Sequence, residues 1–104
     1  MANKQVVVKS NSGAVQRGQE AVILSRETGD GIRWVSECDK PVLIVFASNE
    51  GSPFKSRVFK LRAKGSVQSG RLMGKAGKRG AVGVYKYTIM GASANNDPII
   101  IVND

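Results

Sequence analysis

The apolar residues of this chain lie in short runs that are rich in valine and isoleucine and are separated by Gly, Asn, Asp, Ser or Pro. Such runs are typical of β-strands and turns, and helical periodicity is weak throughout. Seven strands are therefore predicted: Gln5–Lys9, Glu20–Arg26, Gly31–Ser36, Val42–Ala47, Arg57–Ala63, Gly83–Met90 and Pro98–Val102. Seven strands in 104 residues indicate an all-β sandwich or barrel, with residues 1–104 forming one domain.

Alternation within the segment 57–64 assigns its side chains to two faces, because successive residues of a strand point to opposite sides. The inward face is predicted to carry Phe59, Leu61 and Ala63. The outward face is predicted to carry Val58 and three cations, Lys60, Arg62 and Lys64. The sequence therefore predicts a charged, solvent-facing strand surface.

Most of the aromatic residues are expected in the core. Trp34 is predicted to face inward together with Ile32, and Tyr85 and Tyr87 share an inward face, with a hydroxyl end that reaches water. Phe54 follows Pro53 in a loop and is the one aromatic residue expected at the surface.

The positive charge is concentrated in the second half of the chain. Residues 51–96 contain ten Lys or Arg and no Asp or Glu, whereas residues 1–50 contain six of each sign, and the formal net charge is +8. The second half should therefore project a positive field that attracts polyanions or an acidic partner.

Part of this charge lies in a segment from Gly65 to Gly80 that has five glycines, too many for a stable helix. We expect a long basic loop at about 65–80. The spacing of its glycines and lysines does not match a nucleotide-binding phosphate loop. The residues predicted to bind an anion or partner are Lys55, Arg57, Lys60, Arg62, Lys64, Arg71, Lys75, Lys78 and Arg79.

Several chemistries are disfavoured by the residue types. The chain has no histidine, and its single cysteine, Cys38, stands between Glu37 and Asp39, whose charges do not favour a thiolate. Neither carboxylate has enough neighbouring oxygen ligands for calcium, so both are interpreted as solvated turn charges. We therefore expect no enzyme activity, no catalytic residues, no metal site and no cofactor.

The longest apolar run, Pro41–Ala47, is far too short to span a membrane. No signal-peptide pattern follows Lys4, and a lone Cys38 agrees with a reducing compartment, so a cytoplasmic location is expected.

The outer segments Gln5–Lys9 and Pro98–Val102 are predicted to be edge strands, which would allow homo-oligomers to form by strand pairing.

Four motifs occur in an order that resembles the cupredoxin-like domain. They are the run Gly29–Val35, the turn Asp39–Pro41 before an apolar strand, the step Ser52–Phe54, and the Tyr-x-Tyr pattern within Gly83–Tyr87. The resemblance covers the chain from about Ile32 to its end. It implies a Greek-key β-sandwich.

The copper chemistry of that family does not carry over. The resemblance places Val42 near the position of the first histidine ligand and Ile89 near that of the cysteine ligand, whereas a type 1 copper site takes two histidines, a cysteine and a weak axial ligand. Cys38 lies at the wrong strand end, and Met90 alone is no copper site.

The sequence thus favours a non-catalytic binding or structural module on a copper-free cupredoxin-like scaffold, which docks an acidic protein surface through its basic strand and loop. The alternative is a nucleic-acid-binding protein without sequence specificity, which would use the same cations against phosphates. A steep loss of affinity with salt would favour the alternative.

Overall fold

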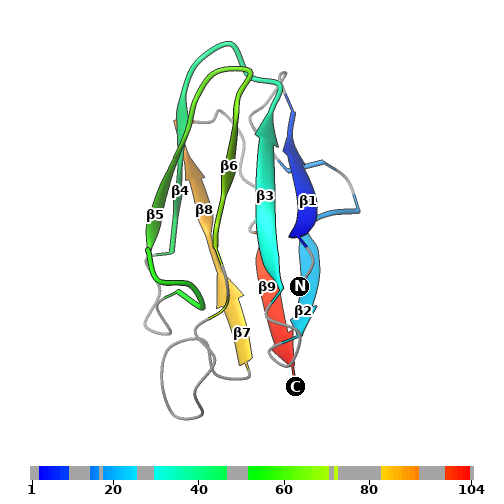
Figure 1. Cartoon of the computed structure of the whole chain (residues 1–104). Coiled ribbons are helices and arrows are strands. Elements are labelled where there is room, and N and C mark those ends of the chain that lie inside the picture. The colour runs from blue at the N-terminus through cyan, green and yellow to red at the C-terminus, as the bar shows by residue number, and fades with distance from the viewer. Residues whose placement is uncertain are drawn as a thin grey trace.

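The structure is a computed structural model that describes residues 3–9, 15–16, 18–25, 30–46, 52–70, 72, 83–91 and 98–103 (Figure 1). These residues form nine strands: β1 Asn3–Val8, β2 Ala21–Ser25, β3 Gly31–Ser36, β4 Val42–Val45, β5 Val58–Leu61, β6 Ser66–Gln68, β7 Gly83–Lys86, β8 Thr88–Met90 and β9 Ile99–Asn103. Among the described residues there is no helix whose length and apolar character would let it cross a membrane.

The strands form a sandwich of two layers. One layer has the order β1-β3-β6, with β1 parallel and β6 antiparallel to β3. The other contains β5-β4-β8 and β2-β9-β7, in which β2 runs parallel to β9. β8 continues the direction of β7 after Tyr87, and the Tyr87 N–H donates to the Pro98 carbonyl at 3.1 Å. The sheets β5-β4-β8 and β2-β9-β7 therefore form one continuous layer (Figure 1).

An aromatic cluster fills the space between the layers. Trp34 on β3 is fully buried, and the ring centroids of Phe59 and Tyr87 lie 5.2 Å and 5.7 Å from its own. Phe46 and Phe54 each lie 6.4 Å from Trp34. The predicted inward orientation of Trp34, Tyr85 and Tyr87 is confirmed, since all three are buried. Such edge and tilted ring contacts add to the burial of apolar area in stabilising the core.

Two of the described connections cross between the layers at one end of the sandwich. Residues 37–41 connect β3 to β4, and residues 62–65 connect β5 to β6 (Figure 1). The two connections are joined by hydrogen bonds from the Ser36 N–H to the Gly65 carbonyl at 2.8 Å and from the Lys64 N–H to the Cys38 carbonyl at 3.0 Å. They therefore support each other.

The all-β prediction is confirmed, with two corrections to the strands. β6 was not predicted and falls within 65–80, so this segment is not wholly a loop. The segment predicted as one strand, Gly83–Met90, changes its hydrogen-bonding partner at Tyr87 and forms β7 and β8. Three residues of β6 are too few for alternation to be visible in a sequence.

A third correction concerns the end of β5. The strand stops at Leu61, and a turn follows in which Lys64 has φ 56° and the Gly65 N–H donates to the Arg62 carbonyl at 3.0 Å. Ala63 is therefore exposed rather than inward. Lys60 is the one cation that the strand itself presents outward, whereas Arg62 and Lys64 are exposed on the turn.

The prediction that Pro98–Val102 forms an edge strand is wrong, because β9 lies between β2 and β7. β1 does lie at the end of its sheet, but Gln16 and Gln19 bond to part of its outer side. The Gln16 N–H donates to the Val7 carbonyl at 2.7 Å, and the Val7 N–H donates to Gln19 Oε1 at 2.7 Å.

Candidate partner-binding surface

Five exposed cations follow β5 from one end to the other, and we call this set the basic edge: Lys55, Arg57, Lys60, Arg62 and Lys64. β5 is an outer strand of the β5-β4-β8 sheet. Its register pairs Val58 with Val45 and Leu61 with Val42, so Arg57 and Arg62 lie beyond opposite ends of the strand. The edge therefore distributes positive charge along a whole side of the sheet.

The five cations are not equally free to bind. Lys64 Nζ forms an ion pair with Asp39 Oδ1 at 3.3 Å and donates to the Glu37 carbonyl at 2.9 Å. Arg57 Nε donates to the carbonyl of Phe46, the residue after β4, at 3.2 Å. This bond restrains the Arg57 side chain. Folding thus gives Lys64 an acidic partner that is not its sequence neighbour, because the turn after β5 lies against residues 37–39.

Lys55, Lys60 and Arg62 have neither an ion pair nor a side-chain hydrogen bond within the part of the chain that the structure describes. Their charges face water, with no carboxylate of the described residues paired to them. They are the members of the basic edge best able to meet an acidic partner.

Four predicted binding residues, Arg71, Lys75, Lys78 and Arg79, lie outside the described residues. The part of 65–80 that is described is held against β3. Ser69 Oγ accepts the Ile32 N–H and donates to the Gly70 carbonyl, both at 2.8 Å. Of the nine predicted residues, the structure thus describes the five of 55–64, which lie on β5 and on the segments that flank it.

The six aromatic residues of the chain are all buried. The prediction that Phe54 lies at the surface is wrong, since it is 1% exposed. Ser52 folds the segment before β5 inward, because its hydroxyl accepts the Phe54 N–H at 3.1 Å and donates to the Ser56 carbonyl at 2.7 Å. No aromatic face is therefore available on the surface for base stacking.

The tyrosine pair also differs from expectation at its polar end. Tyr87 Oη and Trp34 Nε1 are buried and have no hydrogen-bond partner within the described residues, so the Tyr87 hydroxyl does not reach water. Desolvation by burial raises the pKa of Tyr87 to about 12, and a weak interaction with the Trp34 side chain, which does not meet hydrogen-bond geometry, offsets part of that rise.

The positions that the resemblance assigns to copper ligands are filled with aliphatic side chains. Val42 and Ile89 are both buried and lie on the inner side of β4 and β8. Neither offers a donor atom, and Met90 points to the opposite, outer side, where it is 54% exposed. These residues do not fit a type 1 copper ion.

The remaining candidate ligands are engaged elsewhere. Glu37 pairs with Lys9 at 3.1 Å, and Asp39 pairs with Lys64. The Cys38 thiol is buried and donates to the Lys9 carbonyl at 3.5 Å. Across the described ranges no three His, Cys, Asp or Glu residues gather as a metal site would require.

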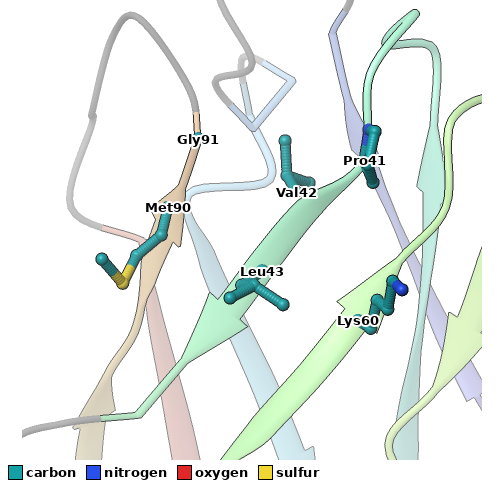
Figure 2. Close-up of a pocket in the computed structure, with 6 residues that line it drawn as sticks. All are labelled: Pro41, Val42, Leu43, Lys60, Met90 and Gly91. Carbon is teal, nitrogen blue, oxygen red and sulfur yellow. The ribbon is translucent and has the colours of Figure 1, made fainter.

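A pocket of about 340 Å³ lies where β4 begins and β8 ends, at the same end of the sandwich as Arg62 and Lys64 (Figure 2). Its lining is apolar apart from one lysine and consists of Pro41, Val42, Leu43, Lys60, Met90 and Gly91. This pocket was not predicted from the sequence. The sequence does contain a signal for it. Because Val42 and Ile44 face inward, alternation along β4 places the apolar Leu43 on the outer face.

Comparison with known proteins gives a likeness in fold without a likeness in sequence. No protein-family model matches the chain, and a search of curated proteins found no relative. Among solved structures, the chain is similar to a novel purple cupredoxin from Nitrosopumilus maritimus, with a TM-score of 0.62 and 12% identity over 97% of this chain and 100% of that one.

It is also similar to a mutant of amicyanin in its reduced Cu(I) form, with a TM-score of 0.61 and 11% identity over 99% of this chain and 86% of that one. Both likenesses extend over nearly the whole chain. The motifs, the two-layer arrangement and these structures agree, and the protein has a cupredoxin-like β-sandwich fold.

Proposed function

We propose that this protein is a non-catalytic binding module that docks an acidic surface of a partner protein through its basic edge. The observation that carries the proposal is the line of exposed cations along β5, of which Lys55, Lys60 and Arg62 face water without an ion pair in the described structure. Complementary charge of this kind speeds association and selects acidic partners.

The scaffold supports a role in binding more than one in redox chemistry. The side chains at the family's ligand positions, Val42 and Ile89, are aliphatic, and the one cysteine is buried beside the Lys9 carbonyl. What the fold presents to a partner is therefore a stable β-surface with positive charge. Its function on this proposal is recognition.

The burial of all six aromatic residues weighs against the alternative of single-stranded nucleic acid. Proteins that bind single strands without sequence preference combine cations with exposed aromatic rings, each of which stacks on a base. Here the cations are exposed and the rings are not. An acidic protein surface needs only the cations.

The test measures binding of the purified protein to a labelled peptide of alternating Glu and Ser, and to labelled single- and double-stranded oligonucleotides, over a salt series. The variant Lys55→Ser/Lys60→Ser/Arg62→Ser should bind the peptide about tenfold more weakly or worse, since each exposed charge contact contributes up to about 1 kcal/mol.

The matched control removes the same charge from the opposite layer, as Lys4→Ser/Lys9→Ser/Arg33→Ser, and should keep most of the affinity. Equal losses in the two variants would show that net charge rather than the basic edge drives binding. Oligonucleotide binding much tighter than peptide binding, with a steep salt dependence, would replace the proposal with the nucleic-acid alternative.

A further inference from the structure

The outer face of the β5-β4-β8 sheet contains an apolar area next to the basic edge. Leu43 on β4 pairs in register with Met90 on β8 and with Lys60 on β5, so the three side chains form one row across three strands. Leu43 is 39% exposed and Met90 is 54% exposed. Figure 2 shows Leu43 between the other two.

This row forms one side of the 340 Å³ pocket, and Pro41, Val42 and Gly91 complete its lining. The volume is near the lower limit of roughly 300 Å³ for small-molecule sites, which suits an amino-acid side chain better than a large cofactor. Exposed apolar side chains gathered around a hollow are typical of places where another molecule docks.

Charge selects what the pocket can accept. Lys60 is the only charged residue in its lining, and its ammonium has no ion pair or hydrogen bond in the described structure. Arg62 follows Leu61, the register partner of Val42, and therefore adds positive charge at the same end. An apolar group that enters here is met by unpaired cations on the β5 side.

We propose that the pocket binds an apolar anchor side chain, such as leucine, that lies next to a carboxylate in the acidic segment of a partner protein. The anchor would contact Leu43, Met90 and Pro41, and the carboxylate would pair with Lys60. This inference rests on the proposed function, because it assigns the partner's sequence character to the same surface. Buried apolar anchors surrounded by polar contacts carry much of the energy of protein interfaces.

A second copy of this chain is a poorer occupant. Face-to-face docking through this row would bring the Lys60 residues of two copies together, and each copy has a formal charge of +8. Like charges at an interface oppose association. An acidic partner instead complements both the row and the basic edge.

The experiment compares two labelled peptides of equal charge, one of alternating Glu and Ser and one in which a central Ser is replaced by Leu. The leucine peptide should bind the wild-type protein about tenfold more tightly, the gain expected from burying one leucine side chain. In the variant Leu43→Ser/Met90→Ser the ratio of the two affinities should fall to about one.

The matched control is Ile23→Ser/Val84→Ser, which changes two exposed apolar residues of the same layer on β2 and β7, 57% and 50% exposed. It should preserve the tenfold ratio. Its spectrum and melting curve, with those of the pocket variant, establish that both proteins remain folded.

Equal affinity of the wild-type protein for both peptides would overturn this inference while leaving the proposed function intact. Absence of binding to either peptide would overturn both. A dimer in solution that Leu43→Ser/Met90→Ser dissociates would assign the row to self-association and likewise overturn the inference.

Discussion

At the scale of single residues, Tyr87 is the side chain whose environment departs most from its chemistry. Its hydroxyl is buried beside the Trp34 indole, and neither polar atom has a hydrogen-bond partner among the described residues. A buried polar group without a partner costs about 1–3 kcal/mol. The aromatic cluster therefore contains a local defect that an apolar ring would remove.

The variant Tyr87→Phe should raise the free energy of unfolding by about 1 kcal/mol in urea titrations at neutral pH. Because burial raises the pKa of Tyr87 to about 12 in the folded state, the wild-type protein should also lose stability as pH rises from 10 toward 12. Between pH 10 and pH 12 the free energy of unfolding of Tyr87→Phe should fall by about 2 kcal/mol less than that of the wild-type protein.

Tyr85→Phe, the same change on β7 two residues before Tyr87, is the control for removal of a tyrosine hydroxyl. Comparison of the two variants isolates the contribution of the Tyr87 hydroxyl. A Tyr87→Phe protein less stable than wild type at neutral pH would show that the hydroxyl is satisfied.

At the scale of elements, the start of β3 depends on the absence of a side chain. A Cβ atom at Gly31 would lie 2.5 Å from the Gly70 carbonyl oxygen and 2.9 Å from Asn3 Oδ1. The first of these is backbone and cannot rotate away. β3 and the segment after β6 can therefore approach this closely only with glycine at position 31.

Gly31→Ala should lower the free energy of unfolding by about 1–3 kcal/mol, as overpacking does, when measured by denaturant titration. Gly70→Ala is the control that separates a steric clash of the added Cβ from the conformational cost of replacing a glycine. Gly70 has φ 80° and open space around it, so alanine there has only the conformational cost of about 1 kcal/mol. Wild-type stability in Gly31→Ala would contradict the close approach.

The sequence predicted the longer elements because their patterns are strong. β3 has the predicted bounds Gly31–Ser36, and Phe59 and Leu61 face inward as alternation requires. β6 was missed because three residues contain no period. The Lys64–Asp39 ion pair was missed because it joins two turns far apart in the sequence, and only the folded chain brings them together.

The candidate site shows the same division between local and long-range information. The exposed cations of 55–64 were predicted from their charge and from strand alternation, both of which are local features of the sequence. The pocket needs three strands in register, with Lys60, Leu43 and Met90 side by side, and strand pairing is not visible in the sequence of any one of them. The inward position of Phe54 was missed for a similar reason, since two hydrogen bonds of Ser52 decide it.

At the scale of the whole molecule, the fold is cupredoxin-like while the side chains at the ligand positions are not ligands. We expect addition of Cu(I) or Cu(II) to leave the melting temperature unchanged and to produce no thiolate-to-copper absorption band. A ligand that binds the folded state raises the melting temperature, and one that does not bind leaves it unchanged. Calorimetry with and without copper therefore tests this expectation directly.

Cys38→Ser is the control for this measurement, because the chain has one cysteine. A copper-dependent rise in melting temperature that persists in Cys38→Ser would reveal a site built from other groups. A thiolate band in the wild-type protein that this variant loses would contradict the burial of Cys38 against Lys9.

The two connections between the layers have a consequence for recognition. The chain changes layers at 37–41 and again at 62–65, and bonds from Ser36 to Gly65 and from Lys64 to Cys38 and Glu37 hold these passages against each other. Separation of the two passages would break these bonds. Pro41 belongs to the first passage and lines the pocket, so this part of the rim is held in place without a partner, and association there need not include the entropy cost of ordering it.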